Sequence, residues 1–405
     1  MAVGKDFFPK MYPVPGFRLG ASSAGIKKSG KKDLVVMELA EGSTVGGSFT
    51  KNLFCAAPVK LAKERIYSNK IRYLVTNTGN ANAGTGDLGR QHAESICESL
   101  AKSMSVNKET VLPFSTGVIG EYLPIEKIIS ALPSALSSLS ENGWDTAAMS
   151  ILTTDTRPKG ASVKLKLSEK NIIITGIAKG SGMIRPDMAT MLTYIATDIA
   201  IDQELIKEII RNAVDCSFNR ITVDGDMSTN DSAILVATGL SGVDFSELSL
   251  DDQKIFTDNL KDIFLSLACQ VVQDGEGATK FVTVRVSSGK TASECLRVGY
   301  SIAESSLVKT ALFASDPNWG RILSAIGMSG VLDLDIKKIQ IYLDDVLIAE
   351  NGGRASSYME NFGQEIMDKE SLSININLNR GDSSEIIYTT DLSHDYIKIN
   401  SEYRS

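Results

Sequence analysis

The residues with the clearest chemical potential lie in one short segment, Lys179–Leu192. Its first part is a loop with two glycines and Pro186, too irregular to continue a helix or a central strand, and it leads directly into a β-prone segment that begins at Thr190. If the bond between Ala189 and Thr190 is cut, Thr190 carries a free amine beside its own hydroxyl. One residue then supplies a nucleophile and a base, so the segment predicts a self-cleavage site.

A free amine on Thr190 solves a chemical problem, because a threonine hydroxyl is a poor nucleophile at neutral pH and must be activated. An α-amino group titrates near pH ~8, so part of it is neutral and can accept the hydroxyl proton. The sequence holds two histidines, His92 and His394, which disfavours schemes that need several. We interpret both histidines as ordinary surface residues.

Polar loops that contain glycine could complete the site. Thr116 and Gly117 can present a hydroxyl and a backbone N–H to one point, as an oxyanion hole requires, although small polar turns are common. Glu276 lies between two glycines ahead of a strand, where a carboxylate can face a ligand amine; a surface turn is the alternative. Residues 224–231 are rich in oxygen ligands but lack EF-hand spacing, so we expect a hydrogen-bonded turn that supports the site.

Gly84, Gly86 and Gly89 form a literal GxGxxG pattern ahead of a helix. A dinucleotide fingerprint needs its glycines immediately after the strand, whereas residues 77–83 intervene here. The pattern therefore favours a structural loop near the site. A non-catalytic nucleotide-binding protein built around these glycines is kept as a rival hypothesis, and it predicts an uncut chain.

Composition limits the classes of protein to consider. With 405 residues, 43% hydrophobic and 22% charged, the chain is expected to form two domains or one large layered unit of a soluble globular protein. A net charge of -7 without a Lys/Arg stripe argues against nucleic acid as a partner.

Five scattered cysteines favour buried free thiols over disulfides or a zinc site, and we expect no metal. No signal peptide and no apolar run of ~18 residues is seen, so we expect no membrane association and a cytoplasmic protein.

Alternating β-rich and helical patterns predict an α/β fold. Strands are expected at residues 33–38, 71–77, 162–166, 171–177, 190–199, 232–238, 280–286, 338–343, 371–378 and 385–390. Helices are expected at residues 89–103, 124–139, 203–216, 251–272 and 292–313. Strict alternation, as in residues 371–378, suggests sheets with one covered face, so we predict mixed sheets layered with helices.

These residues together resemble the ornithine acetyltransferase family, the bifunctional glutamate N-acetyltransferases of arginine biosynthesis. The likeness runs from Val14–Phe17 and Ala56–Val59, through the loops above and the 179–192 segment, to Lys398–Arg404. It implies an ornithine acetyltransferase/aminopeptidase-like fold that cleaves itself into two chains. An alpha chain of residues 1–189 and a beta chain of residues 190–405, beginning with Thr190, would both contribute to one active site.

The resemblance implies a two-step acetyl transfer. Thr190 attacks the carbonyl of Ala189 in an N-to-O acyl shift, and hydrolysis of the ester releases the two chains. Thr190 then takes the acetyl group from N2-acetylornithine, releases ornithine and passes the acetyl group to glutamate, a ping-pong route to N-acetylglutamate. No cofactor is implied, acetyl-CoA is a possible second donor, and the expected assembly is a heterotetramer of two alpha and two beta chains.

The family's site residues map onto this sequence one by one. Thr116 and Gly117 match the oxyanion hole, and the substrate-contacting positions are Thr153, Lys179, Thr190, Glu276, Asn400 and Ser405. Lys179 can pair with a substrate carboxylate, and Glu276 can hold the α-ammonium group. The family usually ends in threonine; Ser405 keeps the hydroxyl and loses a methyl group.

One rival enzyme shares the chemistry at Thr190. In an N-terminal-nucleophile amidase or aminopeptidase of related fold, water takes the acyl group in place of glutamate. The acceptor pocket decides between the two enzymes, and no interface or strand order can be deduced from the sequence.

Overall fold

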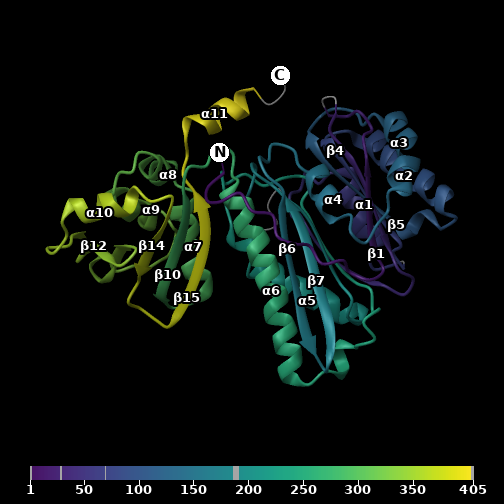
Figure 1. Cartoon of the computed structure of the whole chain (residues 1–405). Helices are drawn as coiled ribbons and strands as arrows, with labels where there is room; N and C mark the ends of the chain where they lie inside the picture. The colour runs from purple at the N-terminus through teal and green to yellow at the C-terminus, as the bar shows by residue number, and fades with distance from the viewer. Residues whose placement is uncertain (1, 28–29, 69, 186–190, 403–405) are drawn as a thin grey trace.

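The computed structural model describes residues 2–27, 30–68, 70–185 and 191–402. Figure 1 shows three sheets side by side: the first with its helices on the right, the second in the middle and the third on the left. All three contain parallel and antiparallel pairs, so the predicted α/β fold of mixed sheets layered with helices is confirmed.

The first sheet has four strands in the order β1-β2-β4-β5, with β4 and β5 parallel. Its strands are β1 (Phe17–Ser22), β2 (Leu34–Leu39), β4 (Tyr73–Asn80) and β5 (Val111–Val118). Its associated helices are α1 (Ala57–Arg65), α2 (Gly86–Met104), α3 (Ile125–Ser137) and α4 (Trp144–Ser150). Leu34 and Val36 of β2 pack with apolar residues of α2 and α3 on one face of this sheet.

The second sheet has five strands in the order β3-β9-β8-β7-β6, with β8 and β9 parallel. Its strands are β3 (Thr44–Phe49), β6 (Lys159–Leu167), β7 (Lys170–Lys179), β8 (Leu192–Thr197) and β9 (Ser232–Ala237). Helices α5 (Gln203–Asp215) and α6 (Leu250–Gln273) cover one face, where Ile195 and Leu235 pack against them.

The first two sheets pack face to face. Tyr194 of β8 lies edge-on to Phe114 of β5 at 5.5 Å between ring centroids, and its hydroxyl lies 2.7 Å from Thr76 Oγ1 of β4. Helices, sheet, sheet and helices therefore form four layers. Because both faces of the second sheet are covered, β8 is buried along its whole length, and the expected single covered face does not hold there.

The third sheet runs β13-β12-β11-β14-β10-β15. Its strands are β10 (Phe281–Gly289), β11 (Gln340–Leu343), β12 (Val346–Glu350), β13 (Gly353–Arg354), β14 (Ser371–Asn377) and β15 (Ser383–Thr390), and its helices are α7 (Ala292–Ala303), α8 (Ser306–Phe313), α9 (Trp319–Gly327) and α10 (Glu360–Met367). In β14, buried residues alternate with residues that are partly or fully exposed, as the pattern predicts for a single covered face. Helix α11 (His394–Ser401) follows β15 at the top of Figure 1.

Two expectations about local structure are wrong. The helix expected over residues 292–313 is divided into two helices, α7 and α8. The break lies at Ser305, whose hydroxyl accepts the N–H of Val308 as the N-cap of α8. The cysteines are not uniformly buried: Cys97 and Cys295 are, whereas Cys216 is exposed. In the described part of the chain, no helix is long and apolar enough to cross a membrane.

Candidate active site

A cavity of about 250 Å³ lies where the ends of β5 and β7 meet the segments that follow α4 and α6 and the last turn of α11. Six residues assigned to the site from the sequence line it: Thr116, Gly117, Thr153, Lys179, Glu276 and Asn400. They come from positions up to 284 residues apart in the sequence. Ala189, Thr190 and Ser405 lie outside the described residues.

The Thr116–Gly117 pair sits at the end of β5, where only glycine fits the second position. Gly117 has φ +133°, and a Cβ there would lie 2.3 Å from the carbonyl carbon of Gly79 on the neighbouring strand. The pairing of β4 with β5 also shifts register at Asn80. Gly117 therefore lets the two strand ends approach closely beside the cavity.

Lys179, the last residue of β7, is buried and directed at Thr116. Its Nζ donates a hydrogen bond of 3.1 Å to Thr116 Oγ1. Burial lowers the pKa of Lys179; the charge of Asp155 opposes this shift and that of Lys159 adds to it. Since the Thr116 oxygen accepts from Lys179, its own proton is left to donate elsewhere, as an oxyanion donor must.

A buried ion network stands behind Lys179. The Nζ of Lys159 lies 2.6 Å from Asp155 Oδ1 and 2.6 Å from Asp274 Oδ2, and all three side chains are fully shielded from solvent. Asp155 also accepts the N–H of Gly180 at 2.7 Å and that of Thr153 at 2.9 Å. Burial is the largest influence on the pKa of Asp155 and disfavours ionisation, but the charges of Lys159 and Lys179 and the hydrogen bonds to the carboxylate together outweigh it and hold the pKa well below its usual range.

Asp274 extends this network to the other side of the cavity. Its carboxylate accepts from the N–H and the hydroxyl of Thr156, and its backbone oxygen accepts from Ser181 Oγ at 2.6 Å. The backbone oxygen of Ser181 in turn accepts the N–H of Glu276 at 2.9 Å. Three cavity-lining segments are thus joined through one buried lysine.

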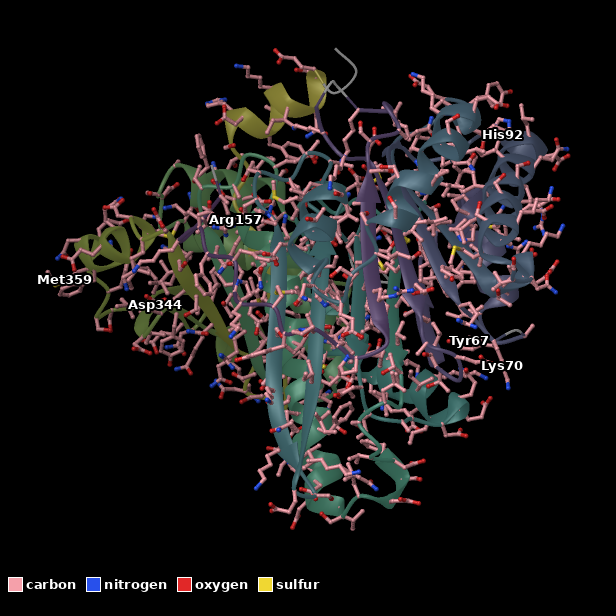
Figure 2. All side chains as sticks on the ribbon, turned by 45° about the vertical axis from the view of Figure 1, so that its right-hand side comes forward. Tyr67, Lys70, His92, Arg157, Asp344 and Met359 are labelled. Carbon is pink, nitrogen blue, oxygen red and sulfur yellow. The ribbon has the colours of Figure 1, made fainter. Side chains whose placement is uncertain are left out.

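Arg157 attaches a further segment to this region. Figure 2 shows Arg157 inside the outline of the molecule, and its guanidinium donates to the backbone oxygen of Val3 at 2.8 Å and to that of Lys5 at 3.1 Å. His92, at the periphery of Figure 2, belongs to α2 and does not line the cavity.

Glu276 is placed by a glycine and by the C-terminal helix. A Cβ at Gly182 would lie 2.3 Å from the Glu276 carboxylate, so the absence of a side chain makes room for it. Glu276 Oε2 accepts from Asn400 Nδ2 at 2.8 Å, and Asn400 also donates to Tyr396 O within α11. Asn400 is therefore docked in the cavity wall through a helix.

Residues 224–231 form a hydrogen-bonded turn, as expected from the sequence. Asp224 accepts the N–H groups of Met183 at 2.6 Å and Ile184 at 2.9 Å, and the hydroxyl of Tyr396 at 3.2 Å. Met183 has φ +58°, which is uncommon for a residue with a side chain, and Asp224 stabilises this conformation. At the other end of the turn, Asn230 Nδ2 donates to the backbone oxygens of Ala81 and Ser115.

The GxGxxG glycines lie where a packed loop leads into α2: Gly84 is in the loop, and Gly86 and Gly89 are in the first turns of the helix. Gly86 begins α2, and a Cβ at Gly89 would lie 1.9 Å from Thr85 Oγ1. Asn82 Nδ2 donates to the backbone oxygen of Gly89 at 2.8 Å. Ala81 of the same loop lines the cavity, which places the loop near the site as the structural interpretation requires.

Comparison with known proteins decides the family. The model of the ArgJ family matches residues 18–405 of this sequence. The chain belongs to the ArgJ family. The family predicted from the Lys179–Leu192 segment and the polar loops is thereby confirmed.

Curated ArgJ relatives match over their full lengths. The chain is 54% identical to "Arginine biosynthesis bifunctional protein ArgJ" of Pseudomonas fluorescens and 55% identical to the protein of that name in Pseudomonas syringae pv. tomato, each over 408 aligned residues that cover 100% of both chains. Among solved structures, ArgJ of Bacillus halodurans is 33% identical, with a TM-score of 0.49 over 52% of this chain and 98% of that chain.

Asp155 and Lys159 went unrecognised in the sequence, although they hold the ArgJ cavity together. Asp155 lies in a polar segment with no glycine signal, and Lys159 begins a strand whose pattern gives no reason to bury an ammonium group. Asp274 lies two residues before Glu276 in the same glycine-containing loop, but the sequence pattern assigns a role to Glu276 alone. Their pairing is visible only once the strands are assembled.

Proposed function

We propose that this protein moves the acetyl group of N2-acetylornithine to glutamate through an ester on Thr190, as a step of arginine biosynthesis. The observation that carries the proposal is the cavity in which Lys179 binds Thr116 while Glu276 faces Gly182, within a chain of the ArgJ family. A cation, a carboxylate and an oxyanion donor then surround the space that a small amino acid needs.

Self-cleavage between Ala189 and Thr190 produces the nucleophile. The resulting chains, Met1–Ala189 and Thr190–Ser405, stay associated because the cut falls between two paired strands. Antiparallel pairs from Ile174–Thr197 to Lys179–Leu192 join β7 of the first chain to β8 of the second. The Lys159 ion network also crosses between the chains, since Asp274 belongs to the second one.

Acetyl transfer follows from these groups. The α-amine of Thr190 takes the hydroxyl proton as Oγ bonds to the acetyl carbon, and the developing oxyanion is stabilised by the Thr116 hydroxyl and the Gly117 N–H. The C–N bond of the donor then breaks, its nitrogen takes the proton, and ornithine leaves. The glutamate amine attacks the ester, which yields N-acetylglutamate and restores the Thr190 hydroxyl.

Substrate recognition uses the two charged side chains. Lys179 has three N–H donors and spends one on Thr116, so a substrate carboxylate can accept another. The Glu276 carboxylate, held by Asn400 through one oxygen, binds an α-ammonium group. Thr153 lies at the same wall and is fixed through its N–H by Asp155. Ser405 supplies a further hydroxyl for the substrate.

Three further features belong to the proposal. Acetyl-CoA serves as a second acetyl donor, supported by the word "bifunctional" in the names of the relatives. Two alpha and two beta chains form the working assembly, without a cofactor. The enzyme works in the cytoplasm.

The test combines fragment analysis with an acetyl-transfer assay. Mass spectrometry of the purified protein is expected to give a chain that begins Thr190-Met191-Leu192, and Thr190→Ala abolishes both cleavage and transfer. With N2-acetylornithine as donor, ornithine release beyond one equivalent per site requires glutamate as acceptor. Rapid ornithine release that ignores glutamate would identify the amidase, and an uncut chain that binds nucleotides would favour the nucleotide-binding rival.

A further inference from the structure

Asp231 lies directly beside the residue that follows Thr190. Its Oδ1 accepts the N–H of Met191 at 3.1 Å, and the next residue, Ser232, donates its own N–H to Met191 O at 3.1 Å. Parallel pairing then continues from Leu192 opposite Ser232. Two hydrogen bonds and a strand register therefore fix Asp231 against the backbone of Met191, the residue that follows Thr190 in the sequence.

The second oxygen of Asp231 has no such bond. Asp231 is fully buried, and its Oδ2 has no hydrogen-bond partner among the described residues, although the hydroxyls of Ser228 and Thr50 lie near the carboxyl group. Buried carboxyl oxygens in proteins are normally bonded, because an unpaired buried charge costs several kcal/mol or more. The carboxyl group of Asp231 thus uses Oδ1 to hold Met191 and leaves Oδ2 unsatisfied among the described residues.

A purely structural role does not account for the acidic group. The bond to Met191 needs one acceptor oxygen, which an asparagine amide also provides. No ion pair of 4 Å or less joins Asp231 to a described cation, and Lys179, whose charge acts on it, gives its bond to Thr116. The titratable groups that act on Asp231 are Lys179 of β7 and Cys55 of the segment before α1.

We propose that Asp231 is the proton-transfer residue of self-cleavage, an inference that rests on the proposed function. In its acid form Asp231 gives its proton to the nitrogen of Thr190. The bond from Thr190 Oγ to the Ala189 carbonyl carbon forms and the C–N bond between these residues breaks. The proton lost from the Thr190 hydroxyl replaces the one given by Asp231, so the shift begins and ends with a neutral carboxyl group.

The environment of Asp231 keeps it in the form that this step needs. Burial raises its pKa well above the ordinary value, against the lowering effects of the Met191 N–H, the Lys179 charge and the hydroxyls of Ser228 and Thr50. The acid form therefore persists to higher pH than in an exposed aspartate. Cleavage is expected to slow as pH rises through the pKa of Asp231, since the carboxylate has no proton to give.

The test compares Asp231→Asn with Asp198→Asn. Asp198, at the far end of β8, is also buried, its pKa is also raised by burial, and one of its oxygens accepts the N–H of Ile173 at 2.8 Å. Full-length chains made by cell-free translation are chased at pH 6 to 9, and the two products are followed by denaturing electrophoresis. We expect Asp231→Asn to slow cleavage at least about a hundredfold, the usual scale for lost acid–base catalysis, and Asp198→Asn to cleave at the wild-type rate.

The outcomes separate this inference from the proposed function. A wild-type chain that never cleaves contradicts the proposed function itself. A wild-type chain that cleaves, with an Asp231→Asn chain that cleaves at the same rate and with the same pH profile, overturns the role of Asp231 alone. If Asp231→Asn does not fold, as judged by thermal unfolding, the wild-type profile decides: a cleavage rate that stays constant or rises from pH 6 to 9 refutes the inference.

Discussion

The ammonium group of Lys179 donates to the hydroxyl of Thr116 across 3.1 Å, and this bond joins the end of β7 to the end of β5. Lys179 is proposed to bind a substrate carboxylate, and Thr116 is proposed to belong to the oxyanion hole. Substrate binding at Lys179 and charge stabilisation at Thr116 are coupled through a single contact.

Thr116→Ala is expected to lower kcat for acetyl transfer by about a hundredfold to a thousandfold, the usual effect of removing one oxyanion donor. Steady-state kinetics with N2-acetylornithine and glutamate measure it. Thr116→Ser keeps the hydroxyl and is expected to retain most of the activity. Equal losses in both variants would show that the methyl group, and not the hydroxyl, is important.

Gly182→Ala is expected to raise KM for glutamate about tenfold, equivalent to ~1.4 kcal/mol of binding. The added Cβ would lie 2.3 Å from the Glu276 carboxylate and must displace it. Gly327→Ala in α9 is the matched control, because a Cβ there meets nothing within 4 Å and KM should not change. An unchanged KM in both variants would mean that Glu276 does not hold the substrate.

Lys159→Met is expected to lower the free energy of unfolding by about 3–5 kcal/mol, because two buried carboxylates lose their shared partner. Urea unfolding measures the loss. The control is Lys254→Met, since Lys254 pairs with Asp258 on the surface of α6 and its removal should leave stability unchanged. Similar stabilities for the two variants would contradict the structural role of the network.

Asp231→Asn is expected to stabilise the folded protein more at pH 8 than at pH 4. An unfolded aspartate titrates near pH ~3.9, whereas the folded pKa of Asp231 is raised by burial. Its stabilising contribution is present below the unfolded value and is lost as pH rises through the folded value. Thermal unfolding with and without Asp231→Asn, both in a Thr190→Ala background so that the chains stay uncut, measures this at the two pH values, and a difference that does not depend on pH would show that the pKa of Asp231 is not raised.

Local patterns in the sequence predicted much of the fold. Each expected strand overlaps a strand of the structure, and alternation in residues 371–378 matches the single covered face of β14. Alternation could not reveal that β8 is covered on both faces, because the second covering layer comes from a distant sheet. Short helices such as α1 and α4 were missed, since few turns carry too weak a periodic signal.

The proposed site was predictable where a family motif marks it. Thr116, Gly117, Thr153, Lys179, Glu276 and Asn400 were assigned from the sequence, and the structure brings these residues to one cavity. The Asp155–Lys159–Asp274 network was not, because a buried ion pair depends on which strands meet and leaves no spacing rule. Asp231 was noted only as part of a turn, since burial and a free oxygen are properties of the assembled chain.

The central claim is that Thr190 carries the acetyl group as the N-terminus of a separate chain. Intact-mass analysis after incubation with N2-acetylornithine and no glutamate tests it most directly. We predict a chain of residues 190–405 that gains one acetyl group on Thr190, with one ornithine released per site, and that loses the group when glutamate is added. An uncut 405-residue chain that transfers acetyl groups at full rate, or an acetyl group on another residue, would contradict the claim.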